Sequence, residues 1–285
     1  MKWLERIFHR PKDGSVSSEV STPEILRARL KSLYAPAVHL RKSDKKGFSR
    51  IGGLPSLPGD FSWPLWKAAP QSFLAQIDLG EIHQVLPSFL PERGSLYFFY
   101  DQEQSTWGFD PKDAGSWQVV YREDSPATQT PRGAPTGLGP VNIYREKYVV
   151  PQLIDLLPDW ERMKDQGLDW KRDGDAFDEL RNAPFAGLSR HQMMGYPSPV
   201  QNTGMELECQ LASNGIYIGN PEGYRDPRRA ELEPSAPAWK LLLQLDTDDD
   251  TGMMWGDVGT LYFWIREQDA RCRDFSKVWM ILQCG

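Results

Sequence analysis

Apolar residues gather along the chain in short runs that are typical of buried strands. Residues 73–79 read FLAQIDL, residues 95–100 read SLYFFY and residues 116–121 read SWQVVY. Similar runs return in the second half of the chain, at residues 206–211, 240–245, 260–265 and 277–283. Runs of four to eight β-branched and aromatic residues between turn-forming residues indicate strands. The pattern predicts two groups of strands.

Helical spacing of apolar residues marks other regions. A helix is predicted over residues 22–34, where Thr22 supplies an N-cap and Pro23 a first-turn proline. A second helical pattern covers residues 150–165, although a proline interrupts it, and helical pieces are expected over residues 177–194. The chain therefore mixes helices with strands.

The N-terminal end carries a short apolar stripe, Trp3, Leu4, Ile7 and Phe8, surrounded by basic residues. Such a segment suits a membrane surface or a partner protein. A helix docked on its own domain or a frayed end is the favoured interpretation, because twelve residues are too few for a stable isolated helix. A polar, serine-rich stretch follows it. We expect residues 1–21 to form a flexible N-terminal segment.

The two groups of strands share one order of motifs. FLAQIDL at residues 73–79 matches LLLQLDT at 241–247, and GSLYFFYD at 94–101 matches GTLYFWIR at 259–266. A Gly-Pro loop precedes each pair, and an aromatic-aliphatic strand follows it. In the first half this loop belongs to the stretch 51–64, which is predicted to be loop or edge structure and not a central strand.

This order predicts an internal duplication. The expected fold class is α+β, with internally duplicated antiparallel β-rich units and flanking helices. Residues 22–285 would form a single domain of two repeats, at about 50–124 and 193–285, joined by a loop and helix connection.

Composition narrows the class of protein. The chain has 285 residues and a formal net charge of -6, which disfavours binding to nucleic acid phosphates. No stretch approaches 18 continuous apolar residues, so no transmembrane segment is expected. The start lacks the continuous apolar stretch of a signal peptide. These features predict a cytoplasmic protein.

The cysteines and histidines are scattered. Cys209, Cys272 and Cys284 are an odd number without C-x-x-C spacing, and each is flanked by residues that read as strand. They are therefore interpreted as buried thiols in a reducing compartment. The four histidines are not paired at ligand spacing, so neither a cofactor nor a tightly bound transition metal is expected.

An acidic run is the closest approach to a metal-binding motif. Asp246, Asp248 and Asp250 alternate, as do the first ligands of a calcium loop. The glycine that an EF-hand needs at position 6 falls at position 7, and position 12 is Asp257. The run is thus a candidate for weak cation binding, but a solvated turn after a strand explains it better.

Four polar residues lie inside otherwise apolar strands. Gln76 and Asp78 alternate on one face of their strand, and Gln244 and Asp246 do so in the matching strand. Buried polar groups need partners. They either link the Gly-Pro loops to the sheet or meet in one pocket between the repeats, and we favour the first interpretation.

Trp255 and Asp257 flank a glycine directly after the acidic run. An aromatic ring beside an acid suits a ligand-stacking floor, and it suits a tight turn with a capping carboxylate equally in chemical terms. We favour the turn, and keep both residues as ligand-binding candidates.

Several stretches together resemble the YwqG family of bacterial proteins. They are IGGLPSLPGDFSWP (51–64), FLAQIDL (73–79), GSLYFFYD (94–101), WGFDPKD (107–113), GYPSPVQ (195–201), ELECQLASNG (206–215), LLLQLD (241–246), GMMWGDVGTLYFWI (252–265) and KVWMILQC (277–284). The resemblance implies an α+β fold and assigns neither catalytic residues nor a cofactor. Some relatives occur in the company of bacterial secreted toxins, which suggests an immunity-type role.

The chain shows no signature of nucleophilic catalysis, such as G-x-S-x-G. Together with the many aromatic residues, which commonly anchor interfaces, this favours a non-enzymatic binding or interaction protein with another protein as its partner. The alternative is an enzyme or a small-ligand or cation binder that uses an acidic cleft between the repeats. The sequence leaves the oligomeric state open.

Overall fold

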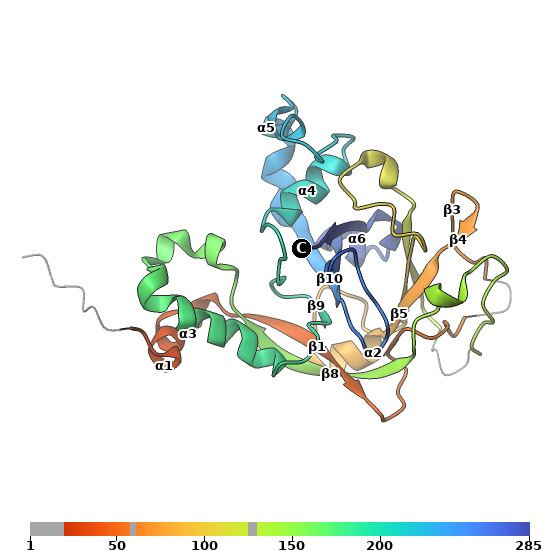
Figure 1. Cartoon of the computed structure of the whole chain (residues 1–285), viewed down its shortest axis with the longest axis horizontal. Coiled ribbons are helices and arrows are strands. Elements are labelled where there is room, and N and C mark those ends of the chain that lie inside the picture. Colours follow the sequence, from red (N-terminus) through yellow and green to blue (C-terminus); the bar gives the residue numbers. More distant parts are fainter. Residues whose placement is uncertain (1–19, 58–60, 125–129) are drawn as a thin grey trace, which may run out of the picture.

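Figure 1 shows the computed structural model of the chain, which describes residues 20–57, 61–124 and 130–285. The amphipathic stripe predicted near the N-terminus lies outside the described residues, as does most of the segment expected to be flexible.

Ten strands of the described part form one antiparallel sheet, in the order β12-β11-β10-β9-β1-β8-β2-β5-β6-β7. Their bounds are β1 (Ala35–Ser43), β2 (Arg50–Ile51), β5 (Ser72–Asp78), β6 (Ser95–Tyr100), β7 (Trp117–Arg122), β8 (Lys147–Leu156), β9 (Gln192–Met193), β10 (Trp239–Asp246), β11 (Thr260–Arg266) and β12 (Trp279–Gln283). The short strands β3 (Leu65–Trp66) and β4 (Ala69–Pro70) form a separate hairpin.

The large sheet curls into a near-barrel. Phe98 of β6 and Phe263 of β11 are far apart in the strand order, yet their ring centroids lie 5.2 Å apart. Both rings are fully buried, as are most residues of β6 and β11, because the curled sheet encloses its own core. Aromatic side chains bury large areas and so dominate the energetics of such a core.

Helices flank this sheet, so the chain is a mixed α+β protein. They are α1 (Pro23–Arg29), α2 (Leu79–Val85), α3 (Trp170–Asn182), α4 (Met205–Ala212), α5 (Arg229–Leu232) and α6 (Glu267–Arg271), with 3-10 turns that include η5 (Trp160–Gln166) and η9 (Phe275–Lys277). Helix α4 packs against β10 and β12. In Figure 1, α1 and α3 form a lobe that projects from the body at the end of β1 and β8.

The strongest strand predictions are confirmed. Strands β5, β6, β7, β10 and β11 lie within a residue or two of the aromatic and aliphatic runs that predicted them. The prediction for residues 277–283 is right from Trp279 onward, while Lys277 belongs to η9. Thr22 caps α1 as expected, since its side chain accepts a hydrogen bond from the Ile25 amide.

Three predictions of secondary structure are wrong at least in part. The helical pieces expected over residues 177–194 end with η6 (Ala183–Phe185), and Gln192–Met193 is strand β9. The run 206–211 is not a strand but helix α4, in which Met205, Cys209 and Ala212 are buried at helical spacing. The helical pattern at 150–165 covers the end of strand β8, and the chain turns helical only at η5. A short apolar run fits either type of element, so tertiary contacts decide between them.

Strands β1 and β8 were not predicted, and each contains a proline. Pro36 pairs with Asp155 and Pro151 pairs with Leu40 in the β1–β8 ladder. Strand β9 joins β1 at Val38 and its neighbour, and β2 joins β8 only near its start, so each proline lies where its strand has one neighbour. A missing N–H is tolerated at such positions.

The two edge strands of the sheet, β7 and β12, meet without forming a ladder. The indole of Trp117 donates to the carbonyl of Val278 at 2.9 Å, and the indole of Trp279 donates to the carbonyl of Gly108 at 2.8 Å. The two rings pack edge to face with centroids 5.0 Å apart. We call this junction the seam.

Gly108 is essential to the seam. It has φ +82°, and a Cβ there would lie 1.8 Å from the Met280 carbonyl oxygen. We predict that Gly108→Ala lowers the free energy of unfolding by at least about 2 kcal/mol more than Gly215→Ala, because the carbonyl must move. Gly215 is the matched control, since it has φ +84° and open space around it. Urea unfolding measures the free energy of unfolding of both variants. Equal losses of this free energy would contradict the close approach at Gly108.

Candidate functional site

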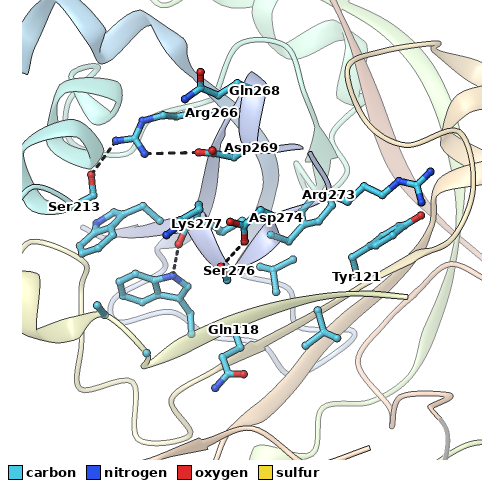
Figure 2. Close-up of a pocket in the computed structure, with 18 of the residues that line it drawn as sticks. Gln118, Tyr121, Ser213, Arg266, Gln268, Asp269, Arg273, Asp274, Ser276 and Lys277 are labelled. Atoms are coloured by element: carbon cyan, nitrogen blue, oxygen red, sulfur yellow. Dashed lines mark hydrogen bonds and ion pairs between the residues drawn. The ribbon is translucent and has the colours of Figure 1, made fainter. Parts of the chain in front are cut away.

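A cleft of about 850 Å³ opens beside the seam. One wall is β7, from Trp117 to Tyr121, and the other is the segment that runs through α6 and η9 to Trp279. The residues that follow α4 close one side. Figure 2 shows this space, which we call the seam cleft.

Aromatic side chains bound the seam cleft at both ends. The Trp117–Trp279 pair lies at one end, and at the other Tyr121 stacks on Phe275 with centroids 5.6 Å apart. Trp117, Val119, Val278 and Trp279 keep 5–7% exposure, whereas Phe98 and Phe263 in the closed core have 0%. The apolar floor of the cleft is therefore reached by solvent.

Charged side chains form the rim of the seam cleft. Arg266 lies 4.1 Å over the Trp239 ring and 3.8 Å from the Asp269 carboxylate. Arg273 pairs with Glu123 at 3.1 Å. Figure 2 shows Lys277 among these groups, and within the described residues its ammonium makes no ion pair within 4 Å.

Among the residues that line the cleft, cations outnumber acids by one, although Glu123 outside the lining neutralises Arg273. The cations are Arg266, Arg273 and Lys277, and the acids are Asp269 and Asp274. The net charge of these lining residues is therefore positive, whereas the whole chain has a formal net charge of -6.

The predicted polar residue Gln76 lies away from the seam cleft and fixes a loop. Its Oε1 accepts a hydrogen bond from the Ser56 amide at 2.9 Å, and its Nε2 donates to the Phe48 carbonyl at 2.9 Å. The Tyr97 hydroxyl donates to the Ser56 carbonyl at 2.8 Å. Two side chains of the sheet thus hold the first Gly-Pro loop.

Gln244 makes the same bonds in the second half. Its Oε1 accepts from the Ser198 amide at 2.8 Å, and its Nε2 donates to the Arg190 carbonyl at 2.9 Å. The Tyr262 hydroxyl donates to the Ser198 carbonyl at 2.7 Å. No hydrogen bond joins Gln76 to Gln244 in the described part of the chain.

The two paired acids also bind local groups. Asp78 caps α2 by accepting from the Glu81 amide at 2.9 Å, and burial raises the pKa of its carboxyl. Asp246 accepts from the Arg190 amide and from the Thr260 hydroxyl, both at 3.0 Å. Both acids hold local backbone, and neither lines the seam cleft.

A lysine occupies the position that a cation would take in the acidic run. The ammonium of Lys42 lies 2.7 Å from Asp248 and 2.6 Å from Asp250. The Asp246 carboxylate is engaged elsewhere, so the three acids do not converge. In the described ranges, no group of three or more His, Cys, Asp or Glu side chains is arranged to hold a metal ion.

Asp248 is buried and has several donors besides Lys42. The Asp246 amide donates to His191 Nδ1 at 3.1 Å, so the imidazole proton is on Nε2, which donates to Asp248 at 2.8 Å. The Ser189 hydroxyl also donates to Asp248, at 3.1 Å. Burial by itself would raise the pKa of Asp248, but the bonds from His191 and Lys42 outweigh it and lower that pKa.

The other two ligand candidates differ in exposure, since Trp255 is buried and Asp257 is exposed. The Trp255 indole is fully buried, packs edge-on against Tyr100 and Tyr144, and donates to the Asp246 carbonyl at 3.2 Å. The indole therefore has no solvent-facing surface on which a ligand could stack.

The three cysteines are free thiols, but not all are buried. Cys209 and Cys284 are buried as predicted, whereas Cys272 is exposed and its prediction is wrong. The expected strand around Cys209 is helix α4, and Cys272 follows α6.

The residues of the seam cleft were not found from the sequence. They come from β7, from residues 266–279 and from the two residues after α4, and the repeat that matches residues 116–121 with 277–283 does not place these stretches side by side. A usable signal was the basic cluster Arg266, Arg271, Arg273 and Lys277 in an acidic chain. Its position opposite β7 depends on the curl of the sheet.

A comparison with protein families bears on this arrangement. A family model described as "Domain of unknown function (DUF1963)" matches residues 49–284, which is most of the chain. The chain belongs to the DUF1963 family. The DUF1963 region contains the seam cleft, both polar pairs and Asp248, while Lys42 precedes it.

Membership of the DUF1963 family assigns no reaction or ligand, because its function is unknown. A search of curated proteins found no match. Across the described residues, no helix of the DUF1963 protein is long and apolar enough to cross a membrane.

The Asp248 cluster yields a prediction. We expect Asp248→Ala to lower the free energy of unfolding at pH 7 by about 2–4 kcal/mol, because it leaves the buried His191 and Ser189 without their acceptor and Lys42 with Asp250 alone. Asp250 is the matched control: it also contacts Lys42 but is exposed, so Asp250→Ala changes little.

The pH dependence follows from the lowered pKa. The pKa of Asp248 is lower in the folded chain than in the unfolded chain, where it is about 3.9. Ionised Asp248 therefore stabilises the fold above this pH, and the stabilisation is lost as the pH falls toward the pKa of the folded chain. The difference in the free energy of unfolding between the wild type and Asp248→Ala should therefore become smaller below about pH 4. Urea unfolding at several pH values measures it, and a difference that is independent of pH would contradict the assignment.

Proposed function

We propose that this protein is a non-enzymatic binding protein that holds a polypeptide partner in the seam cleft. The observation that carries the proposal is a cleft with a half-buried Tyr121 and nearly buried Trp117 and Trp279 in its walls, inside a charged rim. Interfaces combine an apolar centre with a polar rim, and Trp, Tyr and Arg supply most of their binding energy. The seam cleft offers Trp117, Trp279, Tyr121 and Arg266.

The bonding of the acidic residues favours this function over the alternative of an enzyme or a ligand or cation binder between the repeats. Gln76 and Gln244 hold loops, Asp78 caps a helix, and Asp248 is neutralised by Lys42. A general acid or base needs a group that can reach a substrate. These groups are instead engaged with the fold.

The proposal also includes a family resemblance, a type of binding role and a cellular compartment. All nine stretches that resemble the YwqG family lie within the matched residues 49–284, which supports a YwqG-like assignment. An immunity-type role, in which the chain masks its partner, is the form of binding that this resemblance suggests. Three free cysteines support work in the cytoplasm, where thiols stay reduced.

We propose further that residues of about 50–124 and 193–285 are two copies of one unit in a single domain spanning 22–285. The matching loop bonds of Gln76 and Gln244 support this, as do β-bulges at corresponding points of β5 and β10. Equivalent side chains that bind equivalent loops are expected of a duplicated unit.

This proposal predicts equal roles for the two glutamines. Gln76→Leu and Gln244→Leu should each lower the free energy of unfolding by about 2–4 kcal/mol, because each leaves a buried amide and a carbonyl unpaired. The control is Gln118→Leu on the exposed face of β7, which should cost under about 0.5 kcal/mol. A loss at one glutamine that is far larger than at the other would contradict equivalence.

Partner binding can be tested by photo-crosslinking. We predict that p-benzoyl-phenylalanine in place of Gln118, on a wall of the seam cleft, captures a defined polypeptide in native cells. The same probe in place of Glu179, an exposed position on α3 in the projecting lobe, is the control. Lys277→Glu should abolish capture at Gln118, because it reverses a rim charge.

Mass spectrometry of the adducts decides the outcome. Equal labelling at both positions, or capture that survives Lys277→Glu, would contradict binding in the seam cleft. Retention of a small molecule in place of a polypeptide would favour the alternative function.

A further inference from the structure

Strand β7 has an unpaired edge within the described residues. Its one neighbour in the sheet is β6, paired from Ser95↔Arg122 to Tyr100↔Trp117. At the other end of the strand order, β12 pairs with β11. The Trp279 indole and the Leu282 amide of β12 bond Gly108 and Trp107, which precede β7, and the outer edge of β7 itself has no ladder.

This edge is also a wall of the seam cleft. Residues Trp117 to Tyr121 line it in succession. Apart from the β6 ladder, residues 118–122 make no backbone–backbone hydrogen bond to the described chain. On an edge strand, alternate residues present their N–H and C=O groups outward, where another chain can pair with them.

We infer that the partner binds by strand addition: an extended, acidic segment with alternating apolar residues pairs with the outer edge of β7. This inference rests on the proposed function and specifies its binding mode. Main-chain hydrogen bonds would supply affinity, and the cleft would select side chains. Five residues of β7 give a ladder of about 17 Å.

The alternation follows from the two faces of β7. Trp117 and Val119 are buried and Tyr121 packs against the same core, while Gln118 is exposed. An added strand would continue these faces, because successive side chains point to opposite sides. Its inward residues would lie on the apolar floor and near Phe275, and its outward residues would reach solvent and the rim.

The charge follows from the rim. Arg266 is paired with Asp269 and Arg273 with Glu123, whereas Lys277 makes no ion pair with a described residue. An acidic segment would therefore be attracted, and a basic one repelled. A second copy of this chain fits less well, since pairing two β7 edges would bring both cationic rims together.

The test uses synthetic peptides and the full chain. The probe is a fluorescent seven-residue peptide that alternates glutamate and valine. One control replaces each glutamate by lysine, and another carries N-methyl groups on alternate backbone nitrogens, which block a ladder. We expect the probe to bind at least about tenfold more tightly than either control in fluorescence anisotropy.

Variants locate the binding. Lys277→Glu should weaken binding of the probe about tenfold, whereas Lys171→Glu, the same charge change on α3, should leave it unchanged. Binding of the N-methylated peptide as tight as that of the probe would overturn strand addition. So would failure of the probe to bind at about millimolar concentration, the weak limit of specific affinity.

Two further outcomes separate this inference from the proposed function. Capture of a polypeptide at position 118 without preference for the alternating probe would leave polypeptide binding standing and overturn strand addition. A concentration-dependent dimer by analytical ultracentrifugation that Lys277→Glu disrupts would assign the edge to a second copy and overturn the inference.

Discussion

The paired indole hydrogen bonds of Trp117 and Trp279 are the constraint on which the open edge depends. Each indole bonds the segment that precedes the other strand, and the Leu282 amide of β12 donates to the Trp107 carbonyl, so the sheet curls almost to closure without a ladder between β7 and β12. A complete ladder would have used the backbone groups of β7 and sealed the core. Beyond Trp117, β7 stays close to η9, where Tyr121 stacks on Phe275, and the two segments line a cleft with an apolar floor. Exposed edges are liabilities that proteins usually protect with charge. Here the rim supplies the charge and leaves the edge open to a complementary segment.

The buried polar groups have a different role. Gln76 and Gln244 each hold a Gly-Pro loop against a strand, and Asp248 gathers Lys42 and His191 around one carboxylate. Burial makes such groups costly unless every partner is present. The bonds of Gln76, Gln244 and Asp248 satisfy these groups within the fold. The polar interior therefore stabilises the frame, and the candidate binding chemistry lies at the seam.

Local pattern predicted the fold only where one type of element was possible. The run SLYFFY at 95–100 could be little else than a buried strand, and it is β6. The run 206–211 became a helix because its apolar side chains meet the sheet at helical spacing, and β1 kept Pro36 because one neighbour is absent there. Both outcomes depend on contacts that are distant in sequence. The loop bonds of Gln76 matched the interpretation favoured from sequence, whereas Lys277 reaches β7 only through the curl of the sheet, across about 160 residues.

Amide hydrogen exchange on β7 tests the central claim most directly. In the free chain, the outward amides between Gln118 and Arg122 should exchange rapidly, while those of β6 stay protected by ladders on both sides. Addition of the alternating glutamate–valine peptide should slow exchange at the outward amides of β7 and leave β10 unchanged. Protection of all β7 amides in the free chain, or exchange that the bound peptide does not alter, would contradict an open edge that receives a partner strand.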